Sequence, residues 1–251
     1  MRGEGLGDLV RRFPSPALRK PSFGQVMYLR LGNANMAGFL EAVKFQADAE
    51  RPQQVVAVTY LAAKPDSAPA GVRKIARADL DACAALINRT HAGLDLFRPY
   101  SGERLADVLD EGFWALGPHW RPVYGWDDVL VLEEAGQLVA CAGLWDRGRD
   151  MRETWTGPNG ETRKVEVAAA LDIGCAEGRE DALAALLRHL AGLAAERGRQ
   201  SLMVDLERMP AVKARLADLE PTVESRTIEW SPYAPDLPRQ LGECFLDLRN
   251  W

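Results

Sequence analysis

A glycine-rich turn near the start of the chain has the residue types that bind a phosphate group. Arg2-Gly3-Glu4-Gly5-Leu6-Gly7 runs directly into a stretch with helical periodicity. Glycines let the backbone approach a ligand closely, and the amides of a helix N-terminus then point at an anion. A turn of this kind normally follows a β-strand, and no strand precedes this one. We therefore expect half of an anion-binding site in these residues.

The charge balance argues against nucleic acid as the main partner. The 251 residues include 31 lysines and arginines against 36 aspartates and glutamates, a net charge of -5, so no basic stripe supplies phosphate contacts. The apolar content, 47%, is sufficient for the core of one large domain or two smaller ones. A short basic segment over 147–152 is interrupted by a carboxylate, and we expect an exposed hairpin there.

The cysteines and histidines do not predict a metal site. The chain has 4 cysteines and 3 histidines, widely separated, and none of them has the spacing of a zinc site. We therefore expect free thiols and no metal. No apolar run is long enough to cross a membrane, and no signal peptide precedes the predicted fold. The expected location is cytoplasmic, with no membrane partner.

The periodicity of apolar residues predicts a mixed α/β chain, α+β in arrangement, with an interruption after the second strand. We expect strands over 25–30 and 55–61, a helix over 34–45 between them, and a Pro/Gly-rich linker over 65–71. Beyond the linker the pattern predicts strands at 72–75, 129–133, 137–144, 165–173, 202–206 and 225–230, and helices at 78–90, 101–113, 181–197 and 211–219. The resulting order is β-α-α-β-β-β-α-β-α-β.

The chain also matches itself at a fixed offset of 176 residues, which predicts an internal repeat. The turn at Arg2 then falls on Gly178, and the strand and helix after it fall on a later strand and helix. We therefore expect the second half of one unit over 1–64, a linker over 65–71 and a complete unit over 72–251, with the front of the first unit upstream. A half unit cannot bury its apolar faces alone. Its strand residues expected to be covered are Val26, Tyr28, Val56 and Val58.

These features resemble the GNAT superfamily of acetyl-CoA-dependent N-acetyltransferases. The order of elements is similar to the family's, and its pyrophosphate loop, Arg/Gln-x-x-Gly-x-Gly/Ala at the start of a helix, is matched by the glycine turn. The segment over 33–45 is similar to the family's Asn, helix and aromatic residue. The resemblance implies a central mixed sheet flanked by helices and acetyl-CoA as cosubstrate. The implied cofactor contacts are Arg2, Gly3, Gly5, Leu6, Gly7 and Asn33.

Two departures from the family pattern affect this first segment. Leu40 stands where many members have a tyrosine that protonates the leaving thiolate. Pro14 and Pro16 shorten the helix after the glycine turn, because an interior proline removes a backbone hydrogen bond and clashes with the preceding turn. A short helix still presents its first amides, so these departures affect catalysis more than phosphate binding.

The complete unit has its own loop where the resemblance places the pyrophosphate, after its fourth strand. The candidate contacts of this second site are Ile173, Gly174, Ala176, Gly178 and Arg179. However, Asp181 and Leu183 stand where the family has glycines, and a carboxylate close to a phosphate is repelled by about 1 kcal/mol or more. Two interpretations follow. Glu180 and Asp181 simply cap the helix, or the loop forms a distorted CoA site.

Acetyl transfer to an amine requires an amide that polarises the thioester carbonyl, a base for the amine and an acid for the thiolate. By the resemblance, the strand over 165–173 supplies the amide. Glu166 near its beginning is the candidate base, with an exposed structural carboxylate as the alternative, and Asp172 lies near its end. The candidates for the acceptor pocket, in the connection between the first two helices, are His91, Arg98 and Tyr100; alternatively, Arg98 and Tyr100 pack locally.

Two functions follow from this interpretation. The first is an N-acetyltransferase that transfers an acetyl group from acetyl-CoA to an amine of a small molecule or a protein. The second is a catalytically inactive tandem module that binds CoA or serves as a scaffold, because fold resemblance alone does not determine function. The implied partners are acetyl-CoA and an amine acceptor, without nucleic acid or membrane, and a homodimer is one assembly that the sequence allows.

Overall fold

The computed structural model describes residues 25–30, 53–95, 97–111, 123–150, 153–156, 160–231 and 248. The chain divides into two compact units, Met1–Val56 with Ser225–Cys244 and Ala57–Glu224 with Phe245–Trp251. In the first unit, β1 (Gln25–Arg30) pairs antiparallel with β10 (Thr222–Ser231). The glycine turn at Arg2 and the helix expected over 34–45 lie outside the described residues.

The second unit is built on a mixed sheet with the strand order β3-β4-β5-β8-β9-β2. Its strands are β2 (Gln53–Ala62), β3 (Val72–Lys74), β4 (Val129–Glu134), β5 (Gln137–Trp145), β8 (Val167–Cys175) and β9 (Ser201–Val204). Its longer helices are α3 (Leu80–Thr90), α4 (Gly102–Glu111), α6 (Glu180–Glu196) and α7 (Pro210–Arg215). β8 and β9 are parallel, whereas the other neighbouring pairs are antiparallel. This is the mixed α/β architecture, with flanking helices, that the sequence predicted.

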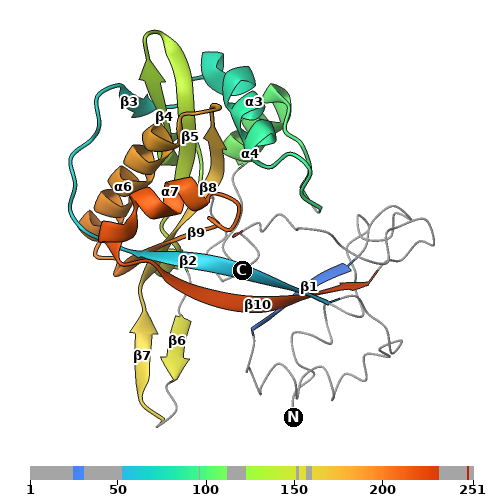
Figure 1. Cartoon of the computed structure of the whole chain (residues 1–251), viewed down its shortest axis with the longest axis vertical. Coiled ribbons are helices and arrows are strands. Elements are labelled where there is room, and N and C mark those ends of the chain that lie inside the picture. The colour runs from blue at the N-terminus through green and yellow to red at the C-terminus, as the bar shows by residue number, and fades with distance from the viewer. Residues whose placement is uncertain are drawn as a thin grey trace. The chain divides into compact units, whose positions relative to one another are not determined.

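The helices α3 and α6 cover opposite faces of this sheet. In β5, Ala140, Ala142 and Leu144 belong to the apolar cluster that includes α6, whereas the Cys141 sulfur between them contacts the backbone of Cys83 in α3. This division follows from the strand geometry, because successive side chains point to opposite faces. Figure 1 shows the same layers, with α6 and α7 on one side of the strands and α3 and α4 on the other. The strand β8 is thus covered from both sides.

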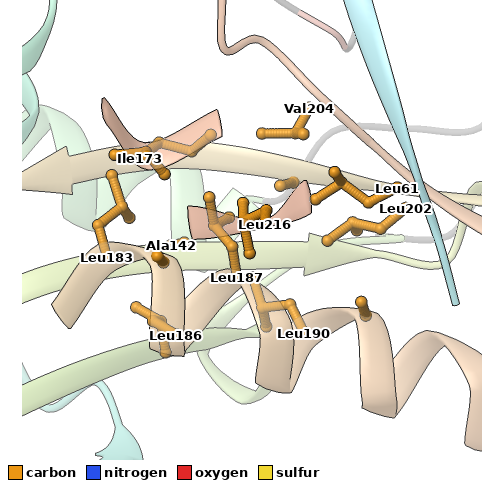
Figure 2. Close-up of a cluster of buried hydrophobic side chains, with 14 of the residues drawn as sticks. Leu61, Ala142, Ile173, Leu183, Leu186, Leu187, Leu190, Leu202, Val204 and Leu216 are labelled. Atoms are coloured by element: carbon orange, nitrogen blue, oxygen red, sulfur yellow. The ribbon is translucent and has the colours of Figure 1, made fainter. Parts of the chain in front are cut away.

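Leucines of α6 form the centre of the core (Figure 2). Leu183, Leu186, Leu187 and Leu190 are all fully buried, and their spacing of three and four residues places them on one face of the helix. They pack against residues of four other elements: Leu61, Ala142, Ile173, Leu202 and Val204. Burial of each such side chain contributes roughly 1.5–3 kcal/mol. This packing fixes the positions of β5, β8 and β9 relative to one another.

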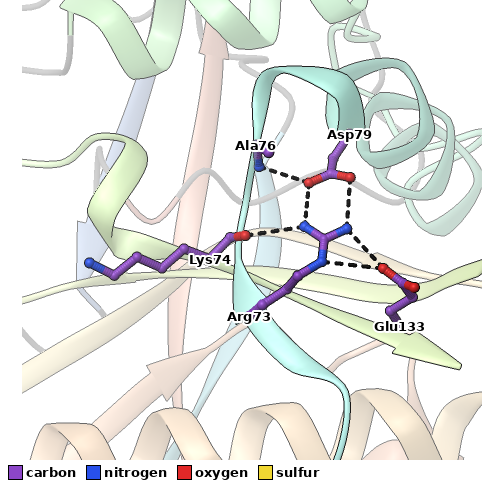
Figure 3. Close-up of polar contacts among 5 residues, drawn as sticks. All are labelled: Arg73, Lys74, Ala76, Asp79 and Glu133. Atoms are coloured by element: carbon purple, nitrogen blue, oxygen red, sulfur yellow. Dashed lines mark hydrogen bonds and ion pairs between the residues drawn. The ribbon is translucent and has the colours of Figure 1, made fainter. Parts of the chain in front are cut away.

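A charged cluster fixes the short strand β3 to the start of α3 (Figure 3). Arg73 donates two hydrogen bonds to the Asp79 carboxylate, at 2.6 and 2.9 Å, and two to Glu133 in β4, at 3.2 and 3.0 Å. Asp79 also accepts a hydrogen bond from the Ala76 amide at 2.7 Å. The Arg73 guanidinium therefore holds the pKa of Asp79 below its usual range. These contacts fix the beginning of α3, which positions part of the site described below.

Two segments between β5 and β8 differ from the prediction. The strand expected over 165–173 is interrupted, because β7 (Thr162–Val165) pairs with β6 (Glu153–Thr156) in a separate two-stranded sheet, and β8 starts only at Val167. The segment expected to be an exposed hairpin instead starts with the short helix α5 (Arg147–Asp150). Arg147 is 3% exposed, and its guanidinium lies 5.5 Å from the centre of the Trp145 ring. Charge pattern alone did not reveal this aromatic contact.

β2 contributes directly to the sheet of the second unit. Its residues from Thr59 to Ala62 pair with Val204 to Ser201 of β9. Val56 and Val58 are 8% and 0% exposed, so these two of the four residues are covered as expected, whereas the side chains of Val26 and Tyr28 lie outside the described part of the chain. Among the residues that the structure describes, a partial second copy of the fold is not evident. None of the described helices combines the length and the apolar character that crossing a membrane requires.

Candidate functional site

A bulge interrupts β8 near its carboxyl end. β8 pairs with β5 through Gly143↔Leu171 and Cys141↔Gly174, so Asp172 and Ile173 together stand opposite a single residue of β5. Asp172 has φ of +50°, in the left-handed region, which costs a non-glycine residue about 1–3 kcal/mol. Bulges of this kind redirect a side chain and interrupt the hydrogen-bond ladder. The bulge therefore gives Asp172 an orientation that a regular strand would not.

The same strand separates from its other neighbour before the bulge. The parallel pairs between β8 and β9 run from Val167↔Ser201 to Ala169↔Met203 and do not continue beyond Ala169 in the described residues. β8 nevertheless extends to Cys175. In sheets with parallel strands, ligands bind at the carboxyl ends where neighbouring strands part. The bulge thus lies on the part of β8 that has left β9.

The Asp172 carboxylate is buried and accepts hydrogen bonds from two tyrosines. Tyr100 donates to Oδ1 at 2.9 Å, and Tyr124 donates to Oδ2 at 2.8 Å. Asp172 is 8% exposed and Tyr124 is 2% exposed, whereas Tyr100 is half-buried. A buried carboxylate is tolerated only when its oxygens are hydrogen-bonded. The three side chains therefore form one polar cluster inside an otherwise apolar strand environment.

Tyr100 is held in place by both helices that flank it. Asn88 of α3 makes two hydrogen bonds to the Tyr100 backbone, one to its amide and one to its carbonyl, both 2.8 Å long. The Arg104 guanidinium lies 4.7 Å from the centre of the Tyr100 ring. Arg104 in turn donates to the carbonyls of Arg98 at 2.6 Å and Pro99 at 2.8 Å. The phenol is consequently presented to Asp172 in a fixed orientation.

The carboxyl end of α3 supports the bulge from the adjacent position. His91 Nε2 lies 3.1 Å from the Ile173 carbonyl oxygen, and the Thr90 hydroxyl accepts a hydrogen bond from the Cys175 amide at 2.8 Å. Burial lowers the pKa of His91 to about 4, although the carbonyl and the nearby Asp172 charge oppose that shift. His91 is therefore neutral near pH 7, and its Nε2–H donates to Ile173. These bonds replace sheet contacts where β8 has no second neighbour.

In the loop after β8, some backbone amides that were predicted to bind the ligand instead make hydrogen bonds within the protein. The Ala176 amide donates to the Val139 carbonyl at 2.8 Å, and the Arg179 amide donates to the Ala176 carbonyl at 3.1 Å. Gly174 packs closely on α3, since a Cβ at that position would lie 2.7 Å from the Ile87 amide nitrogen. Gly178 has φ of +70°, which favours glycine. Gly174 and Gly178 thus have structural reasons to be glycines.

Carboxylates surround the start of α6. Arg179, the residue before the helix, pairs with Glu134 of β4 and lies 3.7 Å from Asp181. The Glu134 carboxylate raises the pKa of Arg179. Glu180 and Asp181 occupy the first turn, and no side chain caps the helix by a hydrogen bond. They therefore complement the helix dipole without acting as caps, and the first amides of α6 are the groups left for an anion.

Glu166 lies in a different cluster, before the start of β8. It pairs with Lys164 and with Arg199, and Arg199 also pairs with Asp146 at 2.6 Å. These cations, Lys164 above all, lower the pKa of Glu166. A carboxylate held ionised between two cations is a weak proton acceptor. The structure does not bring Glu166 together with the residues around the bulge.

The predicted acceptor residues are partly brought together. His91 and Tyr100 both lie at the bulge. The Arg98 side chain is exposed, and in the part of the chain that the structure describes Arg98 contributes through its carbonyl, which accepts a hydrogen bond from Arg104. Sequence reasoning missed the role of Asp172 and did not consider Tyr124. The available signal was a single carboxylate near the end of a run of apolar residues, because such a residue is rarely buried without partners. Arg2, Gly3, Gly5, Leu6, Gly7 and Asn33 lie outside the described residues.

Comparison with known proteins finds similarity in structure only. No protein-family model matches this sequence, and a search of curated proteins found no match. The chain is similar to a GCN5-related N-acetyltransferase from Sphaerobacter thermophilus, with a TM-score of 0.48 and 15% identity over 94% of this chain and 70% of that one. It is also similar to a putative GNAT-family acetyltransferase from Novosphingobium aromaticivorans, with a TM-score of 0.38 and 15% identity over 70% of this chain and 64% of that one.

A third similar structure is Saccharomyces cerevisiae N-myristoyltransferase with bound myristoyl-CoA. Its TM-score is 0.42, with 15% identity over 74% of this chain and 46% of the yeast chain. The chain therefore spans less than two thirds of the length of two of these proteins. Since all three TM-scores are below 0.5, the function of this chain has to be argued from its own residues.

Proposed function

We propose that the second unit binds an acyl-CoA and transfers its acyl group to an amine, with acetyl-CoA as the cosubstrate. The observation that carries this proposal is the course of β8, which leaves β9 after Ala169 and then bulges at Asp172. A strand that parts from its neighbour exposes backbone amides without moving the sheet. An amide so exposed can donate to a thioester carbonyl and stabilise the oxyanion that forms when an amine attacks it.

The pyrophosphate of the cosubstrate is assigned to the start of α6, directly after the bulged strand. The helix N-terminus offers unpaired amides and a positive dipole end. Arg179 supplies a cation there, although Glu134 holds it in the structure described. Ile173, Gly174, Ala176 and Gly178 then shape the loop. The glycine turn at Arg2–Gly7, with Asn33, stays a second proposed CoA-binding segment, belonging to a partial tandem copy.

One observation favours the second candidate function, an inactive CoA-binding or scaffolding module. Glu134, Glu180 and Asp181 place three carboxylates around the first turn of α6. At phosphate distance each of them weakens binding by roughly 1 kcal/mol in high dielectric. If this repulsion outweighs the attraction of the helix amides and Arg179 for the pyrophosphate, the unit has the fold but does not bind the cosubstrate.

Calorimetric titration of the full chain with acetyl-CoA tests the proposal. We expect saturable binding, and we expect Asp181→Asn to tighten it several-fold because one repulsive charge is removed. Asp127→Asn is the matched control, since Asp127 is an exposed carboxylate that pairs with Lys74 on β3. It should leave the affinity unchanged. No heat and no thermal shift at millimolar acetyl-CoA, for the wild type and for Asp181→Asn alike, would contradict the proposal.

A further inference from the structure

The polar cluster at the bulge contains a carboxylate bonded by two phenols of very different accessibility. Tyr124 is 2% exposed and lies over Gly143 of β5, whereas Tyr100 is half-buried in the connection between α3 and α4. Both hydroxyls lie within 2.9 Å of Asp172 oxygens. The cluster therefore has one interior end and one end that approaches solvent, with the carboxylate between them.

The geometry points to a proton relay in which Asp172 accepts a proton at the bulge and Tyr100 passes it toward solvent, while Tyr124 only holds the carboxylate. This inference rests on the acyl transfer proposed above. Asp172 is the only carboxylate that the described residues place within the bulge, and its Oδ1 is joined directly to the Tyr100 hydroxyl. In the structure Tyr100 donates this hydrogen bond, so once Asp172 is protonated the Tyr100 O–H turns from Oδ1 toward water and Asp172 donates to the phenol oxygen across the same 2.9 Å, with no rearrangement of the backbone.

With this relay, every bond, electron pair and proton of the acyl transfer is accounted for. When the amine nitrogen attacks the thioester carbonyl carbon, a C–N bond forms, the C–S bond breaks and the electron pair of that bond stays on the CoA sulfur. An acceptor that arrives as an ammonium ion loses two protons overall. One of them ends on the thiolate, and the other is released. The released proton passes to Asp172, and Tyr100 gives its own hydroxyl proton to water while it takes the proton of Asp172.

The surroundings of Tyr100 suit this task better than those of Tyr124. The Arg104 guanidinium, fixed on two carbonyls, lies 4.7 Å from the Tyr100 ring centre and favours negative charge that develops on that ring during the transfer. Asn88 fixes the Tyr100 backbone through two hydrogen bonds, so the hydroxyl stays aligned with Asp172. Tyr124, in contrast, is 2% exposed and lies against Gly143 in the interior of the unit.

The test compares Tyr100→Phe with Tyr124→Phe in the full chain. The assay follows thiol release from acetyl-CoA with a panel of primary amines, namely benzylamine, putrescine and glycinamide. We expect Tyr100→Phe to lower kcat about 100-fold with little change in the KM for acetyl-CoA. Added imidazole should restore much of that rate in a concentration-dependent manner, because a small base can carry the proton instead. A purely structural role of Tyr100 would not respond to imidazole.

Two further variants make the result decisive. Tyr60→Phe is the matched control, because the Tyr60 hydroxyl also donates a hydrogen bond to a carboxylate, that of Glu224, over 3.3 Å. Tyr60 lies on β2 and Glu224 on β10, whereas the bulge is in β8. It should retain the wild-type kcat. Tyr124→Phe should lower kcat less than Tyr100→Phe and should not respond to imidazole. Equal losses in both bulge variants, or a Tyr100→Phe loss without rescue, would overturn the relay.

The same samples separate the relay from acyl transfer itself. Wild-type binding of acetyl-CoA and amine-dependent thiol release, together with an unimpaired Tyr100→Phe variant, would overturn the relay and leave the proposed function standing. Acetyl-CoA binding without thiol release for any amine in the panel would overturn both the transfer and the relay. Calorimetry on each variant shows whether a lost rate reflects lost cosubstrate binding.

Discussion

Tyr124 occupies the space that a side chain at position 143 would need. A Cβ on Gly143 would overlap the Tyr124 hydroxyl and lie 2.6 Å from the ring carbon that carries it. The absence of a side chain in β5 therefore lets the tyrosine ring lie against the strand and reach Asp172 of β8. One glycine thus determines whether the buried carboxylate has its second hydrogen bond.

Gly143→Ala should displace Tyr124 and weaken the unit. The added methyl group forces either the ring or the strand to move, and overpacking of this kind costs about 1–3 kcal/mol of unfolding free energy. Urea denaturation measures the loss. A double-mutant cycle supplies the control, because in a Tyr124→Ala background the same substitution should cost almost nothing. An equal cost in both backgrounds would show that Tyr124 is not the group displaced.

Asp79→Ala should destabilise the protein by about 2–3 kcal/mol, because Arg73 loses its buried partner and the Ala76 amide loses its acceptor. The lowered pKa of Asp79 means that its contribution is present above the usual carboxyl pKa and is lost as the pH falls through the lower folded value. The difference between variant and wild type should therefore shrink in acid. Urea midpoints at neutral and acidic pH measure both effects.

The matched control for Asp79→Ala is Asp127→Ala. Asp127 also pairs with a cation of β3, Lys74, at 2.7 Å, but both side chains are largely exposed. Exposed pairs of this kind contribute little to stability. We expect no measurable shift of the urea midpoint. A shift as large as that of Asp79→Ala would mean that burial is not what distinguishes the two pairs.

Because of His91, the free energy of unfolding should fall as the pH is lowered from 6.5 to 4. Its pKa is lowered from 6.5 to about 4 in the folded state, so in this range the unfolded chain binds a proton that the folded protein does not. The titration of His91 therefore leaves the free energy of unfolding unchanged above pH 6.5. Below that pH it lowers the free energy of unfolding progressively, by about 3 kcal/mol at pH 4 and below.

His91→Gln serves as the comparison for this pH dependence. The glutamine amide can still donate to the Ile173 carbonyl but does not titrate. The difference in unfolding free energy between the wild type and this variant should change steadily over the stated range. A constant difference from pH 7 to pH 4 would show that His91 is not the titrating group. Chemical denaturation at closely spaced pH values measures it.

Glu166→Gln should leave amine-dependent thiol release from acetyl-CoA unchanged within about twofold, because its two cationic partners give it a structural role. It should lower the urea midpoint, since Arg199 would lose one of the two charged partners that it has among the described residues and keep Asp146. Asp172→Asn supplies the contrast and should abolish the release. A large loss of rate in Glu166→Gln at normal stability would restore Glu166 as the candidate base.

The positions of most elements could be predicted because periodic apolar residues determine them. The leucines of α6 and the alternation in β5 gave those elements almost to their observed ends. The interruption between Val165 and Val167 was not visible, since neither the β6–β7 hairpin nor its separate sheet produces a distinct apolar period. The pairing of β2 with β9 depends on contacts far apart in sequence, which local patterns do not contain.

The candidate site was less predictable than the fold. His91 and Tyr100 were found through a resemblance that indicated their region, but Asp172 became important only through the bulge. A bulge shifts the register of one strand by a residue, and the amino-acid sequence of β8 does not show where that shift occurs. Tyr124 became part of the site because Gly143 leaves room for its ring. This is a relationship between a loop residue and a residue of β5 that sequence spacing does not reveal.

The antiparallel pairing of β2 with β9 also sets an order for folding. Thr59 meets Val204 and Ala62 meets Ser201, so β2 cannot take its place in the sheet until nearly all of the intervening chain is present. Long-range pairing of this kind slows folding, because a large loop must close before any contact stabilises it. Until β9 has been synthesised, β2 therefore lacks this partner, and an apolar strand with an unpaired edge favours aggregation.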